Sequence, residues 1–109
     1  MADTFTLKVL GNGQLPNAIN DLYAVPASTS TIIKTITLVN TNSVAEFINL
    51  YILPNGGTAR RIIPKDCELR AQYSLIFDDE LTLETLDKIQ GDSTNASKVD
   101  FTINGVEKS

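Results

Sequence analysis

The sequence contains no histidine and no tryptophan. Without histidine, the chain lacks the side chain most often used for proton transfer near neutral pH and can form neither a Ser-His-Asp nor a Cys-His arrangement. Without tryptophan, it lacks the commonest aromatic platform for sugars. A reaction that uses two carboxylates stays open, but the composition disfavours an enzyme. We therefore expect no catalytic, cofactor-binding or metal-binding residues.

Cysteine and long apolar runs are also scarce. Cys67 is the single cysteine, so no disulfide can form within the chain. Its neighbours Asp66 and Glu68 disfavour the thiolate, and we interpret the thiol as unreactive. No apolar stretch approaches the roughly 20 residues that a bilayer requires, and residues 1–4 do not resemble the start of a signal peptide. These features predict a chain synthesised in a reducing cytoplasm and not bound to a membrane.

Basic side chains are in the minority. The 109 residues include 9 Lys and Arg against 13 Asp and Glu, a formal net charge of −4. Binding to nucleic acid or to an anionic membrane usually needs a basic excess on one face, so neither partner is expected. The hydrophobic share of 42% and the charged share of 20% are typical of a folded domain rather than a disordered tail. The length fits one domain.

The clearest pattern is an alternation of apolar and polar residues with a period of two. In residues 4–10 the apolar side chains are Phe5, Leu7 and Val9, separated by polar ones. Such alternation is typical of a strand with one buried and one solvent-exposed face, so we expect these three side chains to be buried. By the same criterion, and by their β-branched residues, further strands are expected at 22–25, 31–40, 45–53, 60–63, 71–77, 88–92 and 98–104.

Turn-forming residues separate these segments at intervals typical of all-β domains. Asn55-Gly56-Gly57 is the strongest turn signal, because Asn and Gly accept a positive φ at low cost. The alternation is irregular at Ile33-Lys34, which predicts a β-bulge or a strand end. Residues 79–89 fit an amphipathic helix or a short strand with a tight turn, and we favour the strand. The chain is thus expected to be all-β, an antiparallel two-sheet β-sandwich of about eight short strands, with a jelly roll as one possible arrangement.

Five segments of this sequence together form a recognisable pattern of strands and turns. They are Leu22 to Ala27, Ile33 to Asn40, Leu50 to Pro54, Gly56 to Pro64 and Phe101 to Val106. In these landmarks the chain resembles a recurrent small β-sandwich domain of tailed-bacteriophage virion proteins. Residues 11–20 depart from that pattern. We therefore expect an N-terminal strand and loop arm at 1–20 and a β-sandwich domain at 21–109, within a single structural domain overall.

The resemblance implies a non-enzymatic virion structural protein, most readily a capsid decoration (cement) protein. Such a protein is expected in the virion after synthesis in the host cytoplasm. It would associate with itself, with a trimer favoured, and bind the major capsid protein or other virion proteins. The alternative is a head-fibre, tail-fibre or neck adaptor. A version that recognises a glycan would use polar and aromatic side chains, for example Asn12, Gln14, Asn17, Asn55 and Tyr51.

The first candidate interface is N-terminal and consists of Phe5, Leu7, Val9 and Leu15. A strand joined to its domain by a loop rich in Gly, Asn and Pro can pack on its own sandwich or on a neighbouring subunit. An exposed strand edge also gains main-chain hydrogen bonds when it pairs across subunits.

The second candidate interface consists of Arg60, Arg61 and Arg70 together with Tyr51. Arginine and tyrosine are enriched at protein interfaces, and arginine presents paired donors to acidic surfaces. The alternative for the arginines is that they flank an edge strand and deter aggregation. The alternative for the tyrosines is a place at the rim of the core, with the hydroxyl bonded to the backbone.

Acidic residues gather late in the chain, at Asp78, Asp79 and Glu80, with Glu84 and Asp87 nearby. Their carboxylates are the ligand type that Ca²⁺ prefers, and two of them could act as a glycosidase pair. The segment lacks the spacing of an EF-hand and any accompanying sugar platform. We interpret it as a solvated acidic turn.

Overall fold

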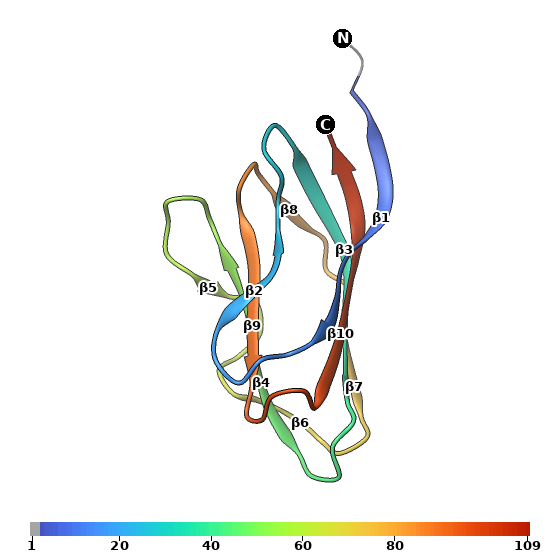
Figure 1. Cartoon of the computed structure of the whole chain (residues 1–109), viewed down its shortest axis with the longest axis vertical. Coiled ribbons are helices and arrows are strands. Elements are labelled where there is room, and N and C mark those ends of the chain that lie inside the picture. The colour runs from blue at the N-terminus through green and yellow to red at the C-terminus, as the bar shows by residue number, and fades with distance from the viewer. Residues whose placement is uncertain (1–2) are drawn as a thin grey trace.

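The period-two alternation produces strands whose inward side chains meet between two sheets. The computed structural model describes residues 3–109, and this part of the chain contains ten strands and no helix (Figure 1). Sheet A consists of β1 (Phe5–Gln14), β3 (Ser30–Asn40), β7 (Ser74–Phe77), β8 (Leu81–Leu83) and β10 (Val99–Lys108). Sheet B consists of β2 (Asn20–Ala24), β4 (Glu46–Leu53), β5 (Arg60–Arg61), β6 (Cys67–Leu69) and β9 (Lys88–Ser93).

All strand pairs are antiparallel, and the two sheets have matching layouts. Sheet A has the order β1-β10-β3, with β7 and β8 both paired to the far edge of β3. Sheet B has the order β2-β9-β4, with β5 and β6 both paired to the far edge of β4. Because two short strands share each of these edges, the ten strands fill eight positions. The order is that of a jelly roll, in which the chain passes repeatedly between the sheets. The expected all-β, two-sheet sandwich is confirmed.

The core lies between the sheets and is almost wholly aliphatic. Its fully buried members include Leu15, Ile33, Ile36, Leu38, Ile48, Leu50, Leu83, Ile89 and Ile103. Each side chain of this size stabilises the fold by about 1.5–3 kcal/mol when it is removed from water. They come from five strands and one loop, so the core joins distant parts of the chain.

The irregular stretch of β3 contains a bulge. Asn104 pairs with Thr35 and Gly105 pairs with Ile33, which leaves Lys34 as the extra residue. The bulge allows both Ile33 and Ile36 to be buried although they are three positions apart. The expected bulge at Ile33-Lys34 is confirmed.

Residues 79–89 form a strand and a tight turn, as expected. After β8, the backbone amide of Asp87 donates to the carbonyl of Glu84 at 3.0 Å. Leu86, inside this turn, has a φ of 69°. No helix within residues 3–109 is long and apolar enough to cross a membrane.

Some strand bounds differ from the expectations. The strand expected at 60–63 is limited to β5, and the one expected at 71–77 begins only at Ser74. Strand β6 was not expected, because three residues between turns are too few to show alternation. The division into an arm and a domain at residue 20 stays a prediction. In the structure, the strand of that segment, β1, is paired with β10.

Candidate assembly surface

The apolar side chains of β1 point away from the core. Phe5, Leu7 and Val9 are 66%, 83% and 53% exposed, so the expectation that they are buried is wrong. The cause is the register of β1 on the strand it pairs with, β10. Leu7 lies opposite Val106 and Val9 lies opposite Asn104, and both partners belong to the outer face of sheet A. Through most of β10 every second residue is buried, and these buried residues point into the core, whereas Asn104 and Val106 alternate with them and point outward.

Leu7 is part of an apolar row that crosses the outer face of sheet A. Leu7 lies opposite Val106, Val106 opposite Ile32, and Ile32 opposite Thr82. Residues that lie opposite one another in adjacent strands share a face of the sheet. The row therefore runs from β1 through β10 and β3 to β8. We call this row and its neighbours the outer patch, which consists of Phe5, Leu7, Val9, Ile32, Thr82 and Val106.

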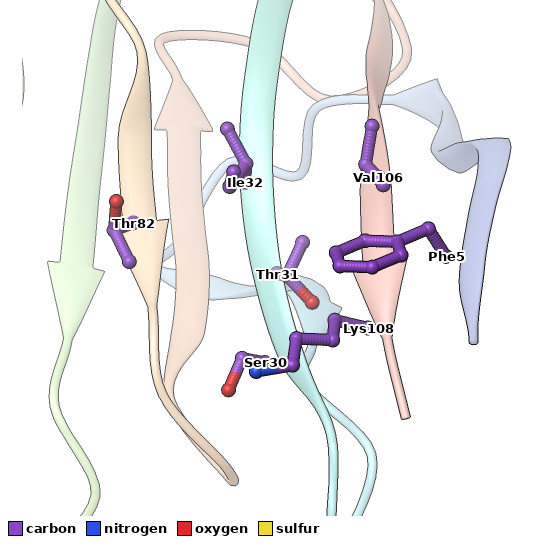
Figure 2. Close-up of a pocket in the computed structure, with 7 residues that line it drawn as sticks. All are labelled: Phe5, Ser30, Thr31, Ile32, Thr82, Val106 and Lys108. Carbon is purple, nitrogen blue, oxygen red and sulfur yellow. The ribbon is translucent and has the colours of Figure 1, made fainter. Parts of the chain in front are cut away.

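A hollow of about 200 Å³ lies in the outer patch. Figure 2 shows the ring of Phe5 extending from β1 across β10 beside Val106, with Ile32 and Thr82 on the neighbouring strands. Ser30, Thr31 and Lys108 complete the lining. The exposed lining is almost entirely apolar, so the hollow suits an apolar side chain better than a polar ligand.

The lysines of the three strands that carry most of the patch are neutralised within the chain. Lys108 lies 3.4 Å from a carboxylate oxygen of Asp3, and Lys34 forms an ion pair with Glu80. Lys8, on the inner side of β1, lies 3.2 Å from Glu107. Each lysine of these three strands therefore has an acidic partner, although the chain carries a net charge of −4.

The second candidate interface divides into two places. Arg61 lies over the ring of Tyr51, with its guanidinium carbon 4.9 Å from the ring centre, an arrangement that is favourable between a cation and an aromatic face. Arg60 is its exposed neighbour on β5, which pairs with the end of β4. Arg70 follows β6, which pairs with the start of β4. The two places are roughly 17 Å apart along β4, so these arginines do not form one patch.

A polar cluster fixes Arg61 on sheet B. Arg61 donates to Oδ1 of Asn49 at 2.6 Å, and the amide of Asp66 donates to the same oxygen at 2.9 Å. Nδ2 of Asn49 donates to the carboxylates of Asp66 and Asp92. Asn49 is buried and uses both ends of its amide here. The cluster is consistent with a structural role on this face.

Other candidate residues are dispersed. Leu15 is fully buried in the core, so its side chain is not part of the surface of this chain. Asn12 and Gln14 lie on β1 in sheet A, whereas Asn55 follows β4 of sheet B and Tyr51 lies within it. The polar side chains named for a glycan site therefore do not share one face.

Tyr23 is a core residue with a polar end. Its hydroxyl donates to Oε2 of Glu107 at 2.6 Å and lies 2.8 Å from the hydroxyl of Thr31. The partners are side chains, so the expected bond to the backbone is not seen. Burial and the neighbouring Glu107 raise the pKa of Tyr23. The hydrogen bond from Tyr23, supported by Lys8, lowers the pKa of Glu107 despite its partial burial.

Two of the acidic residues between β7 and β9 have partners in different parts of the chain. Glu80 is paired with Lys34. Asp87 accepts hydrogen bonds from the backbone amides of Glu84 and Asn55, at 2.9 and 2.8 Å. Within residues 3–109, no group of three or more Asp, Glu or Cys side chains is placed to hold a metal ion.

Sequence reasoning missed three members of the outer patch, Ile32, Thr82 and Val106. One signal was available in the pair Ile32-Ile33. Adjacent residues of a strand point to opposite faces, so in a two-layer sandwich one of the two isoleucines must face outward. The pairing of Val106 with both Leu7 and Ile32 depends on strand order, which no local pattern contains.

No protein-family model matches the sequence, and no curated protein matches it. Solved structures do match. A chain in the acidic stable capsid structure of Helicobacter pylori bacteriophage KHP30 has a TM-score of 0.56 at 12% identity, and the match covers 99% of this chain and 94% of that one. A chain of infectious bursal disease virus, Gx strain, has a TM-score of 0.54 at 13% identity.

The lengths of these two chains differ greatly. The bursal disease virus match covers 99% of this chain but 33% of the viral one, so this chain spans about a third of its length. A chain of the infectious bursal disease virus VP2 subviral particle gives a TM-score of 0.50 at 10% identity, with 32% of that chain covered. At these identities the likeness shows a shared fold.

Proposed function

We propose that this chain is a non-enzymatic structural protein of a virus particle, located in the virion after synthesis in the host cytoplasm. The observation that carries the proposal is the match of the whole jelly roll to a chain of nearly equal length in a phage capsid structure. The exposed apolar patch on sheet A supports a role that depends on contact with other proteins. The hollow in the outer patch has no carboxylate in its lining, and neither does a second hollow beside the turn after β4, which lies between Leu53, Asn55 and Leu86.

Within the particle, we propose the role of a capsid decoration (cement) protein that associates with itself and binds the capsid lattice. Many copies on a repeating lattice hold firmly even when each contact is weak, because binding is multivalent. The trimer that the sequence resemblance implies stays a prediction.

The alternative role is a head-fibre, tail-fibre or neck adaptor, including one that recognises a glycan. A glycan site would need polar and aromatic side chains on one concave surface. The dispersal of Asn12, Gln14, Asn55 and Tyr51 over two sheets favours decoration over this alternative.

The test is the number of copies in purified particles of the virus that encodes the chain. Quantitative mass spectrometry with isotope-labelled peptides measures it relative to the major capsid protein. Decoration predicts hundreds of copies per particle, in a fixed ratio to the shell subunits. A few dozen copies or fewer would favour the adaptor, and absence from infectious particles would overturn the virion role.

A further inference from the structure

We propose that the outer patch packs against the same patch of a second copy of this chain, around a two-fold axis parallel to the strands. The inference deepens the proposed function, since it rests on the proposed self-association and names the surface that carries it. It puts a two-fold dimer in place of the trimer that the sequence resemblance implies. The contact would resemble the packing of two sheets in a sandwich, with strands aligned within about 30° and side chains interleaved.

The shape of the patch supports a two-fold contact. The apolar row has its most exposed bulky side chain, Leu7, at the β1 edge and the small Thr82 at the β8 edge, with the hollow between Phe5, Ile32 and Thr82. A two-fold axis along the strands places the β1 edge of each copy over the β8 edge of the other. Leu7 of one copy then faces the small residue and the hollow of its partner, and the same contact forms twice.

The charges support a second copy as the occupant. Every lysine in β1, β3 and β10 is ion-paired within the chain, to Glu107, Glu80 and Asp3. The face that carries the patch can therefore meet an identical face without strong repulsion, despite the net charge of −4. A strongly charged partner would find no unpaired lysine on these strands, and a carbohydrate would find few polar atoms in the hollow.

The patch is also held in place before binding. The amide of Thr4 donates to the carbonyl of Ser109 at 3.1 Å, and the amide of Ser109 donates to the carbonyl of Thr4 at 2.9 Å. These bonds fasten the start of β1 to the end of β10, so Phe5 and Leu7 lie on a paired strand rather than on a loose tail. A preordered surface loses less conformational entropy when it binds.

The first test is sedimentation equilibrium of the full chain over a wide concentration range. We expect a reversible dimer, and we expect Leu7→Glu to weaken it by about 100-fold or more, because the contact would bury two unpaired carboxylates. Leu7 is 83% exposed in the single chain, so the variant should fold normally, as circular dichroism and thermal unfolding will show. The matched control is Ile76→Glu, at a 61% exposed position of the same outer face, outside the patch. It should leave the dimer unchanged.

The second test addresses the direction of the axis. Two single variants, Leu7→Cys and Thr82→Cys, are each made in a Cys67→Ser background and treated with a short bis-maleimide. We expect cross-linked dimers when the two variants are mixed, and none when either is used alone. In the proposed contact Leu7 faces Thr82 of the other copy, whereas the two Leu7 side chains lie at opposite edges, about 14 Å apart across four strands.

Each outcome separates the inference from the proposed function. A trimer would overturn the two-fold contact and retain self-association. A monomer at all concentrations, or equal effects of Leu7→Glu and Ile76→Glu, would overturn the inference, and the copy number in particles would still decide the virion role. Cross-links in the Leu7→Cys variant alone would contradict the axis.

Discussion

Glu46 is fully buried, and three donors surround its carboxylate. The backbone amide and the side-chain amide of Asn95 donate at 2.9 and 2.8 Å, and Asn42 donates at 3.0 Å. The three bonds join the loop after β3 to the loop after β9. Burial by itself raises the pKa of Glu46, but these hydrogen bonds and nearby Lys98 outweigh it, and the pKa lies below its ordinary value of 4.5.

We predict that Glu46→Gln lowers the free energy of unfolding by about 2 kcal/mol at pH 7, because the bonds to a charged acceptor are lost. The pKa of Glu46 is lower in the folded state than in the unfolded state. Its carboxylate therefore stabilises the fold at a pH above the unfolded pKa of about 4.5, and this stabilisation is lost as the pH falls through the folded-state pKa. The difference between variant and wild type should therefore shrink in acid. Urea unfolding at pH 7 and below pH 4.5 measures both. Glu68→Gln, at an exposed position of β6, is the control, and an equal effect of the two variants would contradict the prediction.

Gly105 is required by a close approach at the bulge of β3. A Cβ built on Gly105 would lie 2.2 Å from the carbonyl oxygen of Ile32 and 2.8 Å from a methyl of Leu10. The first of these atoms belongs to the backbone of a central strand, which cannot move without disturbing the sheet. A side chain of any size at this position therefore forces its neighbours to shift.

We predict that Gly105→Ala destabilises the chain by about 3 kcal/mol, in the upper range for an overpacked site. Gly13→Ala is the matched control, because its Cβ would be 3.4 Å from the ring of Phe101, an ordinary contact. Thermal unfolding of the two variants tests the difference. Similar midpoints for both would show that the bulge adapts.

At the scale of the elements, β1 is less well covered than its neighbours. Its residues from Phe5 to Val9 are exposed on both sides of the sheet, whereas β3 lies between β10 and the pair β7 and β8. Local opening is easiest where few buried contacts must be broken.

We therefore predict faster hydrogen exchange for the amides of residues 5–9 than for those of the central part of β3. Exchange measured by mass spectrometry or NMR at low protein concentration tests this. Repeating it at high concentration should raise the protection of the β1 segment if the outer patch pairs with a second copy. Uniform protection along β1 and β3 at low concentration would contradict the account of this edge.

Local sequence patterns predicted most of the strands, but they did not predict toward which side of the sheet the apolar side chains of β1 point. The strand at 31–40 and the strand and turn in 79–89 were readable, because alternation and turn residues act over a few positions. The outward direction of Phe5, Leu7 and Val9 was not, because it depends on the register of β1 against a strand nearly 100 residues later. The same nonlocal pairing assembles the outer patch, so the candidate surface was predicted only in its N-terminal part.

At the scale of the whole molecule, residues 3–109 form one elongated body of 51 × 26 × 20 Å, with the start of β1 and the end of β10 at the same end of the sandwich (Figure 1). The two sheets present broad outer faces, and the proposed function depends on the contacts that these faces make inside a virus particle.

The most direct test is an electron cryomicroscopy map of intact particles of the virus that encodes the chain. The account predicts density for this jelly roll at regularly repeated positions on the capsid, with the outer face of sheet A covered by a neighbouring copy. A map of mature, infectious particles in which every density is assigned and this chain is absent would contradict it.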